Sequence, residues 1–162
     1  MKKVLAIYGS HRRHGNTDTA LDALLEGMNG QEISIKKLFI PQLKISPCRA
    51  CNLCFRDGKC VVKDDMQWVY EDLWEADMII IATPIYFNNI SSHLKIFIDR
   101  CQCLWAAKYL LKKGPAVKKP RLGHIICTSG SRMKPEEYDC AVKVIHYFYK
   151  CLYVDLKGTT LI

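Results

Sequence analysis

Four cysteines in one short stretch have the types and spacing for metal chemistry: Cys48, Cys51, Cys54 and Cys60. The first three recur at every third residue, and the fourth follows Gly58, which allows the chain to turn back. Thiolates are soft ligands and select an iron–sulfur cluster or zinc over hard cations. Zinc commonly takes its ligands as two separated pairs, often with His, whereas these thiols are all local. The spacing therefore favours a [4Fe-4S] cluster, with a zinc site or a metal-free redox or packing group as alternatives.

A polar loop near the N-terminus has the composition of a phosphate site. The stretch from Gly9 to Thr17 carries hydroxyls, small residues and Arg, and it leads straight into a helical pattern. Backbone N–H groups at a helix N-terminus, the helix dipole and Arg all suit a phosphate monoester. The loop has no Walker pattern, no Gly-x-Gly-x-x-Gly run and no cysteine nucleophile. We expect it to bind a single terminal phosphate; a polar turn that only caps the helix is the alternative.

Two further loops could hold the rest of a mononucleotide. The stretch from Thr83 to Asn89 presents two adjacent aromatic residues after a proline, and its alternative role is a hydrophobic turn over the core. The stretch from Thr128 to Ser131 offers small residues for a ring edge or ribityl chain, Ser129 and Gly130 among them. Ligands of open parallel sheets bind at the carboxyl ends of the strands, where all three loops are expected. Together they point to flavin mononucleotide, FMN.

Strand-like and helix-like segments alternate along the chain, which is typical of an α/β doubly wound sheet. We expect strands at residues 4–8, 32–39, 78–82, 122–127 and 153–161. Helices are expected at residues 17–28, 64–74, 91–111 and 135–151. No closing helix follows the fifth strand, so we expect a partner subunit to cover the sheet beside it.

Length and composition indicate one domain over residues 1–162, with a cysteine-rich loop at about 46–63. Apolar residues make up 49% of the chain, yet none of their runs is long enough to span a bilayer. The N-terminal residues do not resemble a secretory signal, so we expect a cytoplasmic protein without a membrane partner. In that compartment nine cysteines point to metal or redox chemistry rather than to disulfides. Those outside the loop are read mostly as core residues.

The formal net charge of +8 raises nucleic acid as a partner, but the distribution of the charge argues against it. Arg12 and Arg13 fall in the phosphate loop. The other basic residues gather in and around one connection without exposed aromatics between them: Lys108, Lys112, Lys113, Lys118, Lys119 and Arg121. We predict a solvated basic loop and no nucleic-acid partner. The same charges would attract an acidic electron-transfer partner.

Several of these motifs resemble one known family. Gly9-Ser10-His11-Arg12 with Gly15-Asn16-Thr17 resembles the phosphate loop of the NADPH-dependent FMN reductase family. The stretches 83–87 and 94–100 resemble that family's second flavin loop and the helix after it. The cysteine run, with Gly58-Lys59-Cys60 and Asp64-Asp65-Met66, is similar to the branch known as iron–sulfur flavoproteins.

The resemblance implies a flavodoxin-like five-stranded parallel sheet in the order 2-1-3-4-5, noncovalently bound FMN, and a homodimer or homotetramer. It also implies that the four loop cysteines ligate a [4Fe-4S] cluster. On the same grounds, phosphate binding falls to Ser10, Arg12, Asn16 and Thr17, and contact with the ring and ribityl chain falls to Thr83, Pro84, Ile85, Tyr86 and Phe87.

Three functions are consistent with these features. The first is an iron–sulfur flavoprotein that takes electrons from a small donor of the ferredoxin type. The second is a cluster-free NAD(P)H-dependent FMN or quinone reductase with redox thiols, and the third is a non-enzymatic FMN-binding redox module. No Ser–His–Asp arrangement is recognisable, so we expect the flavin itself to carry the chemistry.

Overall fold

A computed structural model of the chain describes residues 1–28, 30, 32–114 and 120–162. Its five strands form one parallel sheet in the order β2-β1-β3-β4-β5, which confirms the expected flavodoxin-like topology. The strands are β1 (Lys2–Tyr8), β2 (Ile33–Phe39), β3 (Met78–Pro84), β4 (Leu122–Thr128) and β5 (Asp155–Leu161). The helices and helical turns are α1 (Asn16–Glu26), η1 (Ile40–Gln42), η2 (Leu53–Phe55), α2 (Met66–Glu75), α3 (Ser92–Arg100), α4 (Gln102–Trp105), η3 (Ala106–Leu110), η4 (Pro135–Tyr138) and α5 (Asp139–Cys151).

The position of each strand in the sheet follows its apolar pattern. β1 and β3 carry unbroken apolar runs, are buried almost throughout, and lie in the interior of the sheet. β2 alternates between exposed and more buried residues and occupies an edge, as its pattern predicts. β5 is the other edge strand, and its pairing with β4 shifts register between Gly123 and His124.

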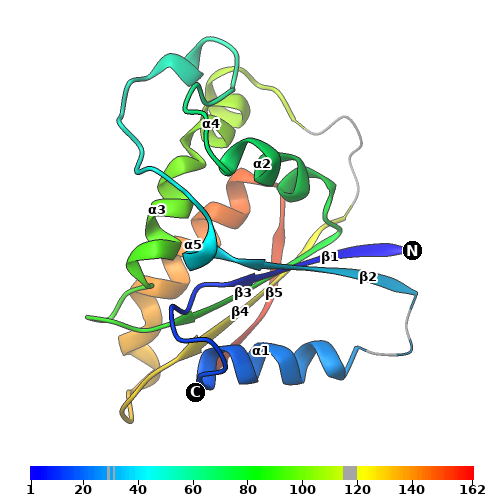
Figure 1. Cartoon of the computed structure of the whole chain (residues 1–162), viewed down its shortest axis with the longest axis vertical. Coiled ribbons are helices and arrows are strands. Elements are labelled where there is room, and N and C mark those ends of the chain that lie inside the picture. Colours follow the sequence, from blue (N-terminus) through cyan, green and yellow to red (C-terminus); the bar gives the residue numbers. More distant parts are fainter. Residues whose placement is uncertain (29, 31, 115–119) are drawn as a thin grey trace.

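The two faces of the sheet are covered unequally (Figure 1). α1 covers one face, where Leu21 and Leu25 pack with residues of β1, β3 and β4. α2, α3 and α5 cover the other face and enclose the larger core. The large core also takes in Cys54 and Cys60, so the cysteine loop rests against this layer of helices.

The helix expected at residues 91–111 is not continuous, which corrects the sequence prediction. α3 ends at Arg100, and the chain continues as the short helix α4 and the π-helical turn η3. The carbonyl of Arg100 accepts hydrogen bonds from the Tyr70 hydroxyl at 2.8 Å and from the Cys103 thiol. The Leu104 N–H instead bonds the Cys101 carbonyl, so the regular helical pattern is interrupted there.

Arg121 is a second correction, because it does not belong to a solvated basic loop. Its side chain is 2% exposed, and its guanidinium donates to the carbonyls of Leu73, Ala76 and Leu152. These carbonyls lie at the C-terminal ends of α2 and α5, where helices leave acceptors unpaired. Burial lowers the pKa of Arg121 to about 10. Lys118 and Lys119 of the predicted loop lie outside the described residues.

No helix in the described part of the chain combines the length and apolar character needed to cross a membrane.

Candidate functional site

A hollow of about 320 Å³ opens at the carboxyl ends of β1, β3 and β4, where the three predicted loops meet. All but two of the residues predicted to bind FMN line it, the exceptions being Thr83 and Phe87. The first loop contributes Ser10, Arg12, Gly15, Asn16 and Thr17; the second contributes Pro84, Ile85 and Tyr86; the third contributes Thr128, Ser129 and Gly130. Three loops far apart in sequence thus share one site, because parallel strands bring their carboxyl ends to one edge.

The first loop is built to receive an anion. The Ser10 side chain is buried and its Oγ accepts the Arg12 N–H at 3.2 Å, which folds the loop into a tight turn. The loop then enters α1 through Gly15, so the first N–H groups of the helix stand at the hollow. Arg12 is the single charged side chain among the described residues that line it. Helix N-terminus and guanidinium together favour a phosphate.

A buried ion pair holds this loop from behind. Asp18 is fully buried in the first turn of α1, and its Oδ2 accepts from Arg13 Nη1 at 2.5 Å and from the His14 N–H at 3.0 Å. The Arg13 guanidinium also lies 3.7 Å from the centre of the Phe39 ring. Arg13 therefore anchors the loop to β2, while Arg12 is left to face the hollow.

Buried hydroxyls tie the loops to each other. Thr17 Oγ1 and Thr128 Oγ1 lie 2.6 Å apart and join the first loop to the third. Ser91 Oγ donates to the Gly9 carbonyl at 2.6 Å. Thr83 Oγ1 accepts the Ser91 N–H at 3.1 Å and donates to the Pro84 carbonyl. Thr83 is thus committed to the protein interior rather than to the hollow.

The second loop ends in a tight two-residue turn. Tyr86 and Asn89 exchange backbone hydrogen bonds of 2.9 and 3.0 Å across it. The two turn residues, Phe87 and Asn88, have φ values of 49° and 57°, in the left-handed region. A bulky residue is strained there. Phe87 is fully exposed at the tip, beyond the hollow that Tyr86 lines.

The cysteine loop is closed at its base by polar contacts. Asp64 Oδ2 accepts the Ser46 N–H at 3.0 Å, and Asp65 Oδ2 accepts the Lys44 N–H at 2.7 Å. Gln67 Nε2 donates to the carbonyls of Cys60 and Val62. The far part of the loop lies against η3, where a Cβ at Gly58 would come within 3.0 Å of Ala107. These contacts fix both the base and the far part of the loop.

All four loop cysteines are free thiols; Cys48 and Cys51 are exposed, while Cys54 and Cys60 are half-buried. Burial raises the pKa of the Cys54 thiol, and the nearby thiols of Cys60, Cys51 and Cys48 raise it further. Within the described residues, no three His, Cys, Asp or Glu side chains are grouped closely enough to hold a single metal ion.

Comparison with known proteins agrees with this geometry. A family model described as NADPH-dependent FMN reductase matches residues 2–154. The chain belongs to the NADPH-dependent FMN reductase family. An iron–sulfur flavoprotein of Archaeoglobus fulgidus is 34% identical over 137 residues, which are 83% of this chain and 58% of that protein. An iron–sulfur flavoprotein of Methanocaldococcus jannaschii is 34% identical over 148 residues, 91% of this chain and 70% of that protein.

A solved structure shares the fold of this family member. The FMN-dependent NADH-azoreductase from Bacillus anthracis, in complex with FMN, aligns with a TM-score of 0.69 at 16% identity. The alignment covers 99% of this chain and 86% of the azoreductase. The resemblance drawn from the loops is thereby confirmed at the level of family and fold. The chain spans between about half and three quarters of the length of the two archaeal relatives.

Sequence reasoning left Gly15 and Thr128 out of the candidate residues of this family member, although both line the hollow. Each lies next to a predicted residue, in one of the three loops predicted to bind FMN. For Thr128 the available signal was the alternation of a strand, which places Thr128 and Cys127 on opposite faces of β4. Cys127 packs in the large core, so its neighbour is free to face the hollow.

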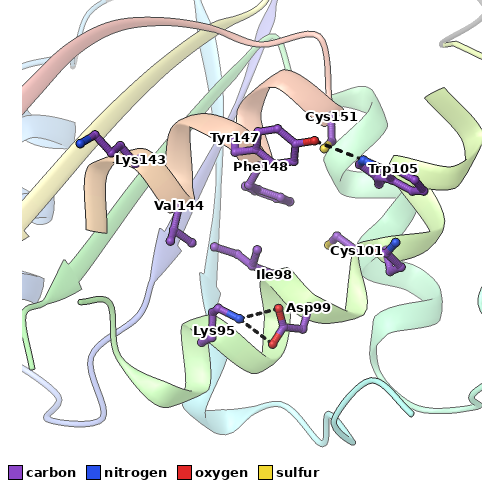
Figure 2. Close-up of a pocket in the computed structure, with 11 residues that line it drawn as sticks. Lys95, Ile98, Asp99, Cys101, Trp105, Lys143, Val144, Tyr147, Phe148 and Cys151 are labelled. Atoms are coloured by element: carbon purple, nitrogen blue, oxygen red, sulfur yellow. Dashed lines mark hydrogen bonds and ion pairs between the residues drawn. The ribbon is translucent and has the colours of Figure 1, made fainter. Parts of the chain in front are cut away.

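A second groove of about 410 Å³ lies between α3, α4 and α5 (Figure 2). Ile98, Val144 and Phe148 line its middle, and Trp105 Nε1 donates to the Tyr147 hydroxyl at 3.3 Å. Among the described residues that line it there is no strand end, and the helix that begins there, α4 at Gln102, is only four residues long. Although this groove is larger than the hollow, the donors at the strand ends favour the hollow as the site of a phosphate-bearing ligand.

Proposed function

We propose that this chain binds FMN in the hollow and acts as an FMN-dependent oxidoreductase that exchanges electrons with a [4Fe-4S] cluster on Cys48, Cys51, Cys54 and Cys60. FMN supplies hydride and single-electron chemistry when bound, and the cluster supplies single-electron chemistry. The observation that carries the proposal is the meeting of three loops around one hollow with a helix N-terminus and one guanidinium.

The residues of the hollow fit FMN part by part. Arg12 and the N–H groups at the start of α1 suit the terminal phosphate. Ile85 and Tyr86 offer apolar surface for a planar ring, while Ser129 and Gly130 offer small polar edges. Thr83 enters this proposal as a support of the second loop, through its bond to Ser91. Phe87 is proposed to cover the ring from the exposed turn.

The donor set of the cysteine loop fits a cluster better than a single ion. The loop supplies four free thiols, the number of cysteines that a [4Fe-4S] cluster takes. A cubane binds one thiolate at each of four irons, so its ligands stand further apart than the ligands of one metal ion. Cys54 and Cys60 pack against the core, so one side of such a cluster would have apolar surroundings.

The two sites lie at opposite ends of α3. Ser91, before the helix, contacts the first loop through Gly9, whereas Arg100, its last residue, contacts Cys60. Nine residues of α-helix rise about 14 Å and separate the two sites within one subunit. We therefore propose a homodimer or homotetramer in which the cluster of one subunit serves the FMN of another, with a small carrier of the ferredoxin type as electron donor.

The first experiment is an anaerobic purification with FMN, iron and acid-labile sulfide quantified per chain. About four irons and four sulfides with one FMN are expected. Cys60→Ser should lose the iron and keep the flavin, while Cys140→Ser, an exposed cysteine outside the loop, should keep both. FMN without iron after attempted reconstitution would refute the cluster, and a chain that binds no FMN would refute the assignment of the hollow.

A cluster-free NAD(P)H-dependent FMN or quinone reductase is the second candidate. The free, exposed thiols of Cys48 and Cys51 favour it, because exposed thiols can cycle between reduced and oxidised forms without metal. Steady oxidation of NADPH by an iron-free, FMN-loaded chain, with a quinone as acceptor, would support this candidate. Absence of turnover with either nicotinamide would exclude it.

A further inference from the structure

A buried arginine stands at the base of the cysteine loop. Arg100 is the last residue of α3, and its side chain is 1% exposed. Its guanidinium forms a fork with the Asp64 carboxylate, Nη1 to Oδ2 at 2.5 Å and Nη2 to Oδ1 at 3.1 Å. The guanidinium donates two further hydrogen bonds, from Nη1 to the Ser46 carbonyl at 2.8 Å and from Nη2 to the sulfur of Cys60 at 3.5 Å.

These four contacts join both ends of the loop to one helix. Ser46 lies just before Cys48, and Cys60 and Asp64 lie at the other end. The Asp64 carboxylate also accepts the N–H groups of Ser46 and Met66, at 3.0 and 3.1 Å. Burial raises the pKa of Asp64, but the bonds from Arg100 and from these two N–H groups outweigh it, so the pKa is lowered. Asp64 is therefore held as an anion against the guanidinium.

Stability alone does not explain why this position carries an ion pair. A buried ion pair is often no more stabilising than apolar side chains of the same volume, because both charges lose their hydration. Lysine could neutralise Asp64, but its single ammonium cannot present a planar fork and two further donors at fixed angles. The particular feature of the arginine is that, besides pairing with Asp64, its Nη2 group also donates to the sulfur of Cys60.

We propose that Arg100 is the positioning residue of the cysteine site: it fixes Cys60 relative to the start of the loop and donates a hydrogen bond to the Cys60 sulfur that raises the reduction potential of a cluster bound there. This inference rests on the proposed [4Fe-4S] function. A hydrogen bond to a ligand sulfur stabilises the more negative, reduced form of a cluster, and a neighbouring positive charge acts in the same direction.

Three variants separate this role from ordinary structural support. Arg100→Met removes the charge and the donors while keeping a side chain of similar length. Arg100→Lys keeps the charge and removes the fork. Arg56→Met is the matched control, because Arg56 is an exposed arginine of the same loop.

Two measurements are made on each variant. In the iron-free chain, hydrogen exchange at the N–H groups of Ser46 and Met66 should become about tenfold faster in Arg100→Met, because their acceptor loses its charged partner. In the anaerobically reconstituted chain, the midpoint potential of the cluster should shift to more negative values in Arg100→Met and by a smaller amount in Arg100→Lys. Arg56→Met should match the unmodified chain in both measurements.

The outcomes distinguish failure of the inference from failure of the proposed function. An unmodified chain that takes up a cluster, with the same potential in both Arg100 variants, overturns the role of Arg100 and leaves the cluster standing. An unmodified chain that takes up no iron refutes the cluster, and the effect of Arg100 on its potential falls with it. If Arg100→Met does not fold, Arg100→Lys decides: an unshifted potential overturns the inference, and a negative shift supports it.

Discussion

The hydroxyl pair Thr17–Thr128 offers a direct test of how the hollow is held together. The two Oγ1 atoms lie 2.6 Å apart, and the residues are 3% and 4% exposed. We would replace each with Val, singly and together. Thr19→Val is the matched control, because Thr19 is exposed two residues further along the same helix.

The magnitude follows from the partner that each variant leaves behind. Removing one hydroxyl leaves the other buried without a hydrogen-bond partner, which costs about 1–3 kcal/mol of stability. A typical hydrogen bond contributes only about 1 kcal/mol net. Each single variant should therefore lower the free energy of unfolding by about 1.5 kcal/mol. The double variant leaves no buried hydroxyl without a partner. Its loss of stability should therefore be smaller than the sum of the two single losses by about 1 kcal/mol.

Urea titration of the four chains measures the stability cycle, and fluorescence titration with FMN measures binding. The Thr17→Val variant should also bind FMN more weakly, because its hydroxyl lines the hollow beside the phosphate loop. Thr19→Val should change neither quantity. The reasoning would be refuted if the two single losses in free energy of unfolding added up to the double loss within about 0.3 kcal/mol, since the two hydroxyls would then be independent.

Three further predictions test other parts of the site and fold. Gly9→Ala should lower the free energy of unfolding by about 1–3 kcal/mol in urea titrations, because the added Cβ would lie 2.9 Å from the Ala82 backbone oxygen; unchanged stability would contradict the packing. Phe87→Asn should raise stability by up to about 1 kcal/mol by relieving the positive φ, yet weaken FMN binding measured by fluorescence; equal affinity would remove Phe87 from the flavin site. Burial lowers the pKa of His124 below 6.5, so the unfolded chain takes up its proton first as the pH falls. Stability should then decline below pH 6.5, and His124→Gln should decline less over the same range, as followed by urea titration.

The interior or edge position of β1, β2 and β3 could be predicted from their residue patterns, whereas the strand order 2-1-3-4-5 is implied by the family resemblance. The unbroken apolar runs of β1 and β3 require burial on both faces, and the alternation of β2 requires an edge. The meeting of the three loops follows from the same topology, since they leave the carboxyl ends of β1, β3 and β4. Local pattern and global topology agree at these places.

Several of the missed features depend on contacts between separate elements of the fold. The interruption after Arg100 needs the Tyr70 hydroxyl, thirty residues earlier, to compete for a helix carbonyl. In the sequence, Arg121 looks like one more basic residue of a polar connection. In the fold, carbonyls at the ends of two helices accept three hydrogen bonds from its guanidinium. Thr83 and Thr128 look alike in sequence, and only the contact of Ser91 with Thr83 turns one inward while the other faces the hollow.

One helix, α3, connects the hollow with the cysteine loop. At its N-terminal end, Ser91 caps α3 by accepting the Leu94 N–H and, through the same Oγ, holds the Gly9 carbonyl of the phosphate loop. At the C-terminal end, where the helix is interrupted, Arg100 donates hydrogen bonds to Asp64 and Cys60. The interruption matters, because a regular continuation would require the Arg100 carbonyl for an ordinary helical bond. That carbonyl is instead fixed by Tyr70 and Cys103, which holds the Arg100 backbone while its side chain reaches the loop. The end of the regular helix at Arg100 thus helps to fix the position of the cysteine loop relative to the hollow.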